Sequence, residues 1–166
     1  MRAAFDVVVI GGGVLGAATA YELASRGHSV AVLERTFPGR QGSGTTAGNL
    51  HIQAIHTRRP GQLSPVDVTR FLPLQRTSYE LWSRVEDRLG EPVGLVASGG
   101  FTVAETEADL AALHEKAVWE HEVGIPTEVL DRAALREAAP ELGETVIGAT
   151  WCAQDGYANA LLTIPA

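Results

Sequence analysis

The feature that most constrains the fold is a glycine pattern near the amino terminus, Gly11-x-Gly13-x-x-Gly16. It follows a β-branched apolar run, Val7–Ile10, which predicts a strand buried on both faces of a parallel sheet. It also opens residues 14–26, where small and apolar residues recur at helical spacing. In this context Gly11 predicts a tight turn, Gly13 a close approach of the backbone to a pyrophosphate, and Gly16 tight packing of helix on strand.

A second strand and an acidic residue complete the unit. Residues 29–33 predict a strand that pairs with the first, giving a βαβ unit. At the start of the helix, the N–H groups of Val14 and Leu15 are placed to bind an anion. Glu34 follows the second strand, where a carboxylate accepts hydrogen bonds from ribose hydroxyls and repels a 2′-phosphate. NADP is therefore the least suitable dinucleotide, which leaves NAD or FAD.

Beyond Glu34 the pattern no longer alternates regularly between strand and helix. Residues 36–62 hold five glycines and predict a long ordered loop around a ligand. The elements expected after it are a helix from Ser64-Pro65, a second helix from Pro73 that buries Leu74, Leu81, Val85 and Leu89, a hairpin of residues 93–96 with 101–104, a helix over 107–122 with its acids in solvent, a strand over 127–130, a helix from Asp131 to Ala138, and a strand over 145–151.

The charge of the chain is unevenly distributed. The formal net charge is −7, yet no acid occurs between Arg35 and Val66, a segment that also contains Arg40, Arg58 and Arg59. This basic segment, beginning at Arg35, suits a position near phosphates, although a solvated basic loop is the alternative. The overall acidity argues against non-specific binding to nucleic acid, so no nucleic-acid partner is expected.

Cysteine content and hydropathy indicate the compartment. The single cysteine, Cys152, excludes an intramolecular disulfide and a cysteine-rich metal site, and we expect it to be a small buried hydrophobe with no metal involved. Asp6 and the glycines interrupt the apolar run that would otherwise resemble a signal peptide. No run of 18 apolar residues occurs, so no membrane span is expected. A reducing, cytoplasmic location follows as the expectation.

The segment after the basic residues separates FAD from NAD. Residues 42–49 read Gly-Ser-Gly-Thr-Thr-Ala-Gly-Asn, and this stretch resembles the second flavin-binding stretch of the D-amino-acid oxidase-like (DAO) flavoproteins, which include glycine oxidase, sarcosine oxidase and amino-acid dehydrogenases. Residues 98–105, Pro140-Glu141-Leu142 and Asp155-Gly156-Tyr157 resemble later landmarks of the family, so the resemblance covers nearly the whole chain. Residues 159–162 are most similar to opine-oxidase and hydroxyproline-dehydrogenase type subunits.

The resemblance implies an FAD-dependent oxidoreductase of amino acids or secondary amines, in which hydride passes from a carbon–nitrogen bond to flavin. The implied fold is α/β, a Rossmann-like FAD-binding βαβ unit plus part of an α+β substrate domain. Residues 1–91 would form the N-terminal part of the FAD-binding domain, with the flavin-contacting loop at 36–62. Residues 92–150 would be part of the substrate domain, and residues 151–166 would return to the FAD-binding domain. The expected cofactor-binding residues are Gly11, Gly13, Val14, Leu15, Gly16, Glu34, Arg35, Ser43, Gly44, Thr45, Thr46, Ala47, Gly48, Asn49 and Leu50.

Candidate reactive side chains are fewer, and the catalytic residues stay unassigned. His51 and His56 follow the flavin loop and could lie near the flavin ring, or could be hydrogen-bonded or solvent-facing loop residues. Arg58 and Arg59 could pair with a substrate carboxylate or simply face solvent. The remaining aromatic candidates are expected in helix cores rather than around a substrate, namely Tyr79, Trp82 and Trp119.

Members of the family are about twice as long as this chain of 166 residues. We therefore expect a C-terminal half, or a partner subunit, to complete the flavin site and to supply the family's catalytic residues. Two alternatives remain open: a NAD-binding Rossmann dehydrogenase and a non-catalytic dinucleotide-binding subunit. A regular βα series after Glu34 would favour the first of these, and none is visible.

Overall fold

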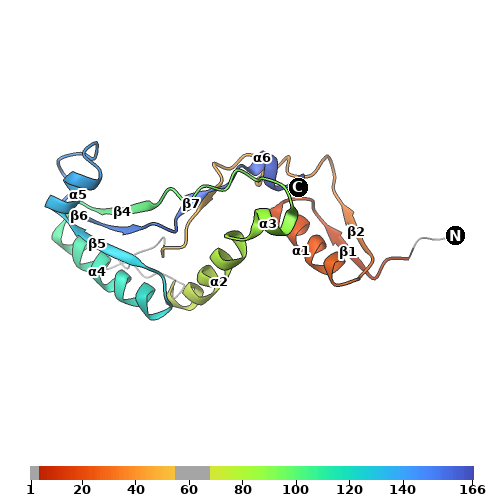
Figure 1. Ribbon diagram of the computed structural model, residues 1–166, viewed down its shortest axis with the longest axis horizontal. Coiled ribbons are helices and arrows are strands. Elements are labelled where there is room, and N and C mark those ends of the chain that lie inside the picture. The colour runs from red at the N-terminus through yellow and green to blue at the C-terminus, as the bar shows by residue number, and fades with distance from the viewer. Residues whose placement is uncertain (1–3, 55–67) are drawn as a thin grey trace. The chain divides into compact units, whose positions relative to one another are not determined.

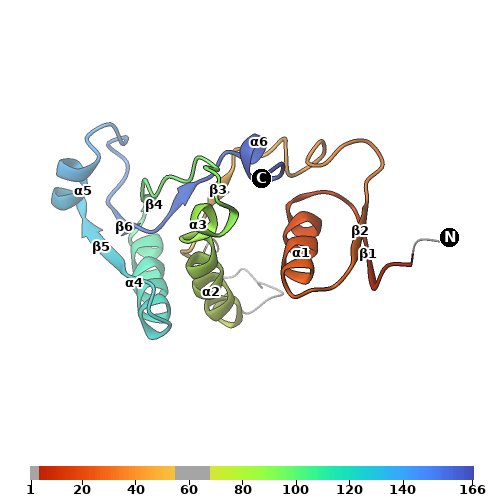
Figure 2. The ribbon, with the colours of Figure 1, turned by 45° about the vertical axis from the view of Figure 1, so that its right-hand side comes forward.

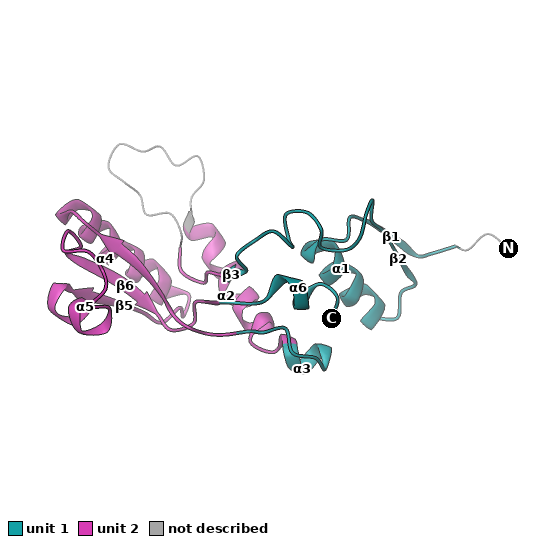
Figure 3. Cartoon of the chain, turned by 90° about the horizontal axis from the view of Figure 1, so that it is seen from above, with its two compact units in different colours: residues 1–49, 86–95, 157–166 teal, residues 50–85, 96–156 magenta. Residues whose placement is uncertain are grey.

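A computed structural model describes residues 4–54 and 68–166 of the chain. It is a mixed α/β structure, as the sequence predicts, and it divides into two compact units (Figures 1 and 3). Unit 1 contains Met1–Asn49, Glu86–Leu95 and Tyr157–Ala166, and unit 2 contains Leu50–Val85 and Val96–Gly156.

The amino-terminal part of unit 1 is the expected βαβ unit. Strand β1 (Val7–Ile10) leads into helix α1 (Val14–Ser25), which returns to strand β2 (Val30–Leu33). The strands pair in parallel, with Val7 opposite Val30 and Ile10 opposite Leu33 (Figure 2). Gly27 ends the helix at φ 88°, the left-handed conformation that glycine adopts without a steric penalty.

The expectation that the first strand is buried on both faces is wrong for the described residues. Val8 and Ile10 have 52% and 87% of their surface exposed, while Val9 faces α1. In the described part of unit 1 this sheet holds just the two strands β1 and β2, so helix α1 covers one face and nothing covers the other. A β-branched run predicts a strand, but the number of layers around it depends on other segments.

Hydrogen bonds join the later segments of unit 1. The Glu86 carboxylate, in α3 (Val85–Leu89), accepts bonds from the N–H groups of Val93 and Leu95 at 2.8 and 3.2 Å. The Val93 carbonyl in turn accepts the Asn159 N–H at 3.0 Å, and the Asn159 side chain caps α6 (Ala160–Thr163). Chain segments distant in sequence are thus fixed through main-chain groups.

The sheet of unit 2 is antiparallel in the order β4-β6-β5. Its strands are β4 (Gly100–Ala104), β5 (Thr127–Asp131) and β6 (Gly148–Cys152). The expected hairpin of residues 93–96 with 101–104 is wrong, because β4 pairs with β6, and Val93 is held by Glu86 and Asn159 instead. A further two-stranded sheet pairs β3 (Asn49–Leu50) with β7 (Gly156–Tyr157).

Two helices of unit 2 begin at side-chain caps. Helix α4 (Glu107–Glu122) begins after Thr106, whose hydroxyl accepts the Asp109 N–H at 3.1 Å. Helix α5 (Arg132–Ala138) begins after Asp131, whose carboxylate accepts the Ala134 N–H at 2.9 Å. Each cap satisfies one of the amides that a helix leaves unpaired at its start.

The helix expected from Pro73 differs in its extent and its buried face. A 3-10 turn, η1 (Val68–Phe71), precedes α2 (Leu72–Trp82), and α3 is a separate helix. Leu72 is the buried residue, at 1% exposed, whereas Leu74 and Leu81 are 63% and 54% exposed, contrary to expectation. The start expected at Ser64-Pro65 lies outside the described residues.

Two apolar clusters form the core of unit 2. In the first, Tyr79, Trp119 and Val123 pack on the buried residues Ile52, Ala54, Leu72, Ile125 and Cys152. In the second, Phe101, Leu130 and Leu142 pack on Leu135, Ala139, Val146 and Ala149. The expected core positions of Tyr79, Trp119 and Cys152 are confirmed.

Truncation of Leu72 tests the observed face of α2. In the full-length protein, Leu72→Ala should cost unit 2 about 2–5 kcal/mol, because it leaves a cavity in the first cluster. Leu74→Ala, on the same helix, should change stability by less than about 0.5 kcal/mol because its side chain is exposed. Urea unfolding followed by tryptophan fluorescence measures both, and equal losses would contradict the assignment.

Candidate dinucleotide site

The site begins at the turn between β1 and α1. Gly11 has φ 105°, which favours glycine, and its N–H donates to the Leu33 carbonyl at 2.8 Å. A Cβ at Gly16 would lie 2.0 Å from the Gly11 carbonyl oxygen, so the helix can start this close to the turn only with glycine at 16. The tight turn and the close packing predicted from these glycines are both present.

Gly13 and Ser43 cover the amino end of α1. Gly13 is the N-cap residue, and a Cβ on it would lie 3.0 Å from the Ser43 hydroxyl oxygen. That hydroxyl accepts the Val14 N–H at 3.0 Å. No acidic side chain occurs in the first turn of α1, so the positive end of the helix dipole is available to an anion.

Glu34 lies against the same turn. Its carboxylate accepts the Gly12 N–H at 2.8 Å and the Thr36 N–H at 3.0 Å. These backbone hydrogen bonds, that of Gly12 first, lower the pKa of Glu34 below its ordinary value. An ionised carboxylate has lone pairs beyond those two bonds, and these can accept hydroxyl groups.

The loop after Glu34 is folded back onto the turn. The Gly39 N–H donates to the Gly12 carbonyl at 2.8 Å, and the Gly44 N–H donates to the Gln41 carbonyl at 2.9 Å. A Cβ at Gly44 would lie 2.0 Å from the Gly39 carbonyl oxygen. Two glycines therefore allow the compact loop that brings Ser43 to the helix.

The expected site residues fall into three groups. The structure brings together those of the turn and the loop base, namely Gly11, Gly13, Val14, Leu15, Gly16, Glu34, Ser43 and Gly44. A second group continues along the chain from this loop into β3: Thr45, Thr46, Ala47, Gly48, Asn49 and Leu50. The side chain of Arg35 is exposed. His56, Arg58 and Arg59 lie outside the described residues.

Gly48 is fixed separately in unit 1. Its φ is 78°, its carbonyl accepts the Ala158 N–H at 3.0 Å, and its N–H donates to the Thr46 hydroxyl at 3.3 Å. A Cβ at Gly48 would lie 2.1 Å from the Ala158 carbonyl oxygen. Glycine is required here on both conformational and steric grounds.

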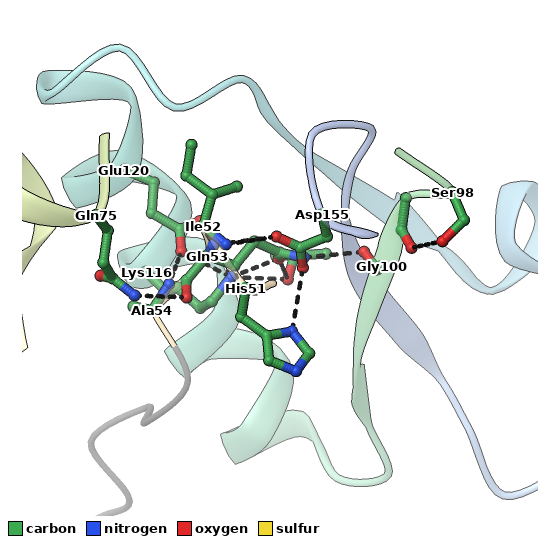
Figure 4. A network of polar contacts seen from close by, with 12 residues as sticks. His51, Ile52, Gln53, Ala54, Gln75, Ser98, Gly100, Lys116, Glu120 and Asp155 are labelled. Carbon is green, nitrogen blue, oxygen red and sulfur yellow. Dashed lines mark hydrogen bonds and ion pairs between the residues drawn. The ribbon is translucent and has the colours of Figure 1, made fainter. Parts of the chain in front are cut away.

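Sequence reasoning missed a buried polar group of residues in unit 2, which we term the Lys116 cluster: Gln53, Lys116, Glu120, Thr150 and Asp155. Figure 4 labels all of them except Thr150. The acids of helix 107–122 were expected in solvent, yet Lys116 and Glu120 are fully buried. Their spacing of four residues is equally typical of a surface ion pair, so the sequence carries no signal for this burial. His51 borders the cluster, with its side chain 47% exposed and its Nδ1 3.7 Å from an Asp155 carboxylate oxygen.

Other site types find no support within residues 4–54 and 68–166. No three His, Cys, Asp or Glu side chains there lie together in a way that could hold a metal ion. None of the helices there has the length and apolar content needed to cross a membrane.

The fold and the turn define a dinucleotide-binding α/β protein, with glycines at the start of a helix and an acid after the second strand. Residues 6–166 match the DAO family, described as FAD dependent oxidoreductase. The chain belongs to this family, and the predicted resemblance is confirmed.

Several known proteins are similar to this chain over nearly its whole length. Glycine oxidase of Geobacillus kaustophilus is 32% identical over 158 residues, and an opine oxidase subunit of Rhizobium meliloti is 28% identical over 167 residues. Each alignment covers 94% of this chain but only 40% and 42% of the relative. The solved structure of glycine oxidase from Geobacillus kaustophilus superposes with a TM-score of 0.78 at 30% identity, over 97% of this chain and 42% of that one. The chain thus spans about two fifths of these relatives.

Substitution of Gly16 tests the steric constraint at the turn. Gly16→Ala should lower the melting temperature of the full-length protein, since the added Cβ meets the Gly11 carbonyl at 2.0 Å and α1 must move. Gly42→Ala should have little effect, because no atom lies within 4 Å of its would-be Cβ. Thermal unfolding compares the two, and a tolerated Gly16→Ala would argue against this packing.

Glu34 should contribute stability in a pH-dependent way. Its folded-state pKa is lowered, so the contribution is present above the unfolded-state pKa and is lost as pH falls through the folded-state pKa. Glu34→Gln should therefore destabilise the protein at neutral pH and match wild type in acid. Melting temperatures across pH measure this, with the exposed Glu91→Gln as control. A difference that persists in acid would contradict the role of the charge.

Proposed function

We propose that this chain is the N-terminal part of an FAD-dependent oxidoreductase that oxidises the carbon–nitrogen bond of an amino acid or secondary amine. The observation that carries the proposal is the amino end of α1, where Gly13 leaves room, Ser43 supplies a hydroxyl and Glu34 supplies a carboxylate. The family of the chain supports FAD as the ligand of this site over NAD.

The residues present fit the ADP half of FAD. The N–H groups of Val14 and Leu15 would bind the pyrophosphate, because the helix amino end favours negative charge. The Ser43 hydroxyl, which accepts the Val14 N–H in this structure, would give up that bond to a phosphate oxygen and donate to the pyrophosphate itself. Glu34 would accept the ribose hydroxyls, since its bonds to Gly12 and Thr36 hold the carboxylate beside the turn. Gly13 would permit the pyrophosphate to approach the backbone, because a side chain on residue 13 would fill the space beside the Ser43 hydroxyl.

The stretch beyond Ser43 would continue along the cofactor. Gly44 to Leu50 supply main-chain N–H groups and the hydroxyls of Thr45 and Thr46, which suit a ribityl chain and flavin edge. We also place the exposed Arg35 near a phosphate, and the positive charge of its side chain is the support for this placement. Bound flavin would supply the hydride acceptor, and the chain would contribute binding and orientation.

The domain assignment follows from this. Residues 1–91, with loop 36–62, and 151–166 would hold FAD, and residues 92–150 would belong to the substrate domain. Support comes from unit 1, which joins the βαβ unit to Glu86–Leu95 and Tyr157–Ala166. Unit 2 also takes in Leu50–Val85 and residues 151–156, and unit 1 takes in residues 92–95, so the structural division differs at these segments.

Substrate and partners are proposed at the level of chemical class. The two named relatives, glycine oxidase and the opine oxidase subunit, support a small amino acid or amine as substrate. The second of them also supports completion of the site by a partner subunit or by a C-terminal half. His51, half exposed after β3, is a candidate neighbour of the flavin. With its one cysteine buried, the chain suits the cytoplasm.

The absorbance spectrum of the full-length protein tests this function. We expect flavin bands that bleach when an amino acid or secondary amine is added without oxygen. Flavin bands that no amine bleaches would favour a non-catalytic dinucleotide-binding subunit. A protein without flavin that binds NADH would overturn the proposal in favour of a NAD-binding dehydrogenase.

Gly13→Val tests the cofactor site directly. The branched side chain would occupy the space beside the Ser43 hydroxyl and block pyrophosphate, so the purified full-length variant should contain no FAD. Gly143→Val should keep the wild-type stoichiometry, because Gly143 lies outside the residues assigned to FAD and a Cβ there would meet only the Thr145 hydroxyl, at 3.9 Å. Flavin released by denaturation and quantified by absorbance gives the ratio. Retained flavin in Gly13→Val would refute the assignment of the turn.

A further inference from the structure

We propose that the Lys116 cluster is a positioning device that fixes the backbone of residues 52–54, and with it His51, directly after the flavin-binding stretch. The inference rests on the proposed function, because residues 43–50 are assigned there to FAD. All members of the cluster, His51 and residues 52–54 belong to unit 2. The positioning residues are Lys116, Glu120 and Asp155.

Three consecutive main-chain amides donate to buried carboxylates. The N–H groups of Ile52 and Gln53 donate to one oxygen of Asp155 at 2.8 and 3.3 Å. The next amide, Ala54, donates to Glu120 at 2.5 Å. An irregular segment is thereby held through its N–H groups, with charge-assisted bonds to carboxylates in place of the carbonyl partners that a strand would have.

Gln53 links Asp155 to Lys116 through its side chain. Its amide nitrogen donates to Asp155 and to the Gly100 carbonyl, both at 2.9 Å. Its amide oxygen accepts Lys116 at 2.7 Å and the Thr150 hydroxyl at 3.0 Å. The side chain therefore makes all four hydrogen bonds available to it, which leaves it one orientation.

Lys116 is saturated in the same way. Its ammonium donates to Gln53, Glu120 and Thr150 at 2.7, 3.0 and 3.1 Å, which uses its three protons. Burial lowers the pKa of Lys116, and the charge of Glu120 opposes that shift. The ion pair costs desolvation that its attraction only partly offsets.

Stability alone is a weak reason for such a cluster. Buried ion pairs can often be replaced by apolar side chains without loss of stability. Here two carboxylates and one lysine occupy an interior that already has apolar clusters. A need to hold one particular backbone segment accounts for the arrangement.

Glycine at position 100 leaves space for the carboxylate of Asp155. A Cβ at Gly100 would lie 2.5 Å from an Asp155 carboxylate oxygen, and the Gly99 N–H donates to the Asp155 carbonyl at 2.8 Å. That carboxylate also lies 3.7 Å from Nδ1 of His51, the partly exposed ionisable group beside it. A shift of Asp155 would therefore move both the segment and the imidazole.

The position of the segment makes its rigidity relevant to the reaction. Residues 52–54 follow β3 (Asn49–Leu50) with only His51 between, so the stretch assigned to FAD continues along the chain directly into the held segment. Misplacement of reacting groups by about 1 Å can cost on the order of 100-fold in rate.

The test uses Lys116→Met/Glu120→Leu in the full-length flavoprotein, because removing both charges avoids an unpaired buried ion. Leu135→Ala is the matched control, since it weakens the second apolar cluster of the same unit without touching the Lys116 cluster. Two readouts are taken: hydrogen exchange of the peptide covering residues 50–54, and the anaerobic rate of flavin reduction by amine.

We expect the double variant to keep its FAD, to exchange the 50–54 amides faster, and to reduce flavin about 10- to 100-fold more slowly. Lys116→Met/Glu120→Gln, which also leaves no unpaired buried ion but keeps an acceptor for the Ala54 N–H, should retain more of the rate. Leu135→Ala should lower the melting temperature with a near wild-type rate.

Unchanged exchange in the double variant would overturn the inference, and so would faster exchange with a wild-type rate. An equal loss of rate in Leu135→Ala would reduce the cluster to a structural role and overturn it as well. If the wild-type protein holds no flavin, or no amine reduces it, the proposed function fails instead. In that case the exchange data alone would show whether the cluster fixes the segment, and the claimed role in the reaction would fall.

Discussion

In the amino-terminal βαβ unit, the Gly11 carbonyl occupies the space that a side chain on residue 16 would need, with a would-be contact of 2.0 Å. This approach places the amino end of α1 beside Gly12, whose N–H binds Glu34 and whose carbonyl accepts Gly39. The loop that begins there returns Ser43 to the helix. A single steric constraint thus gathers the helix end, an acid and a hydroxyl at one point.

Unit 2 fixes its backbone by different means. Its segment 52–54 has no strand partner among the described residues, and buried carboxylates of Asp155 and Glu120 take the place of one. Glycine at position 100 admits Asp155, as glycine at 16 admits the turn. In both units, therefore, a glycine allows the close approach of another group, and carboxylates accept hydrogen bonds from main-chain amides.

The sequence predicted what depends on local geometry: the βαβ unit, the glycine turn and the helix that begins after Asp131. It failed where a distant segment decides. The pairing of β4 with β6 requires a partner more than forty residues away, and the exposure of Leu74 depends on which face of α2 meets the core. The burial of Lys116 could not be predicted from the sequence for the same reason, because its partners Gln53 and Thr150 are remote in sequence. Hydropathy assigns a lysine to the surface unless its partners are known.

A crystal structure of the full-length protein with FAD tests the central claim most directly. The quantity to measure is the distance from the pyrophosphate oxygens to the main-chain nitrogens of Val14 and Leu15. We predict hydrogen-bond lengths of about 2.7–3.2 Å there, with the ribose hydroxyls on the Glu34 carboxylate. A pyrophosphate bound away from the amino end of α1, with Glu34 free of the ribose, would contradict it.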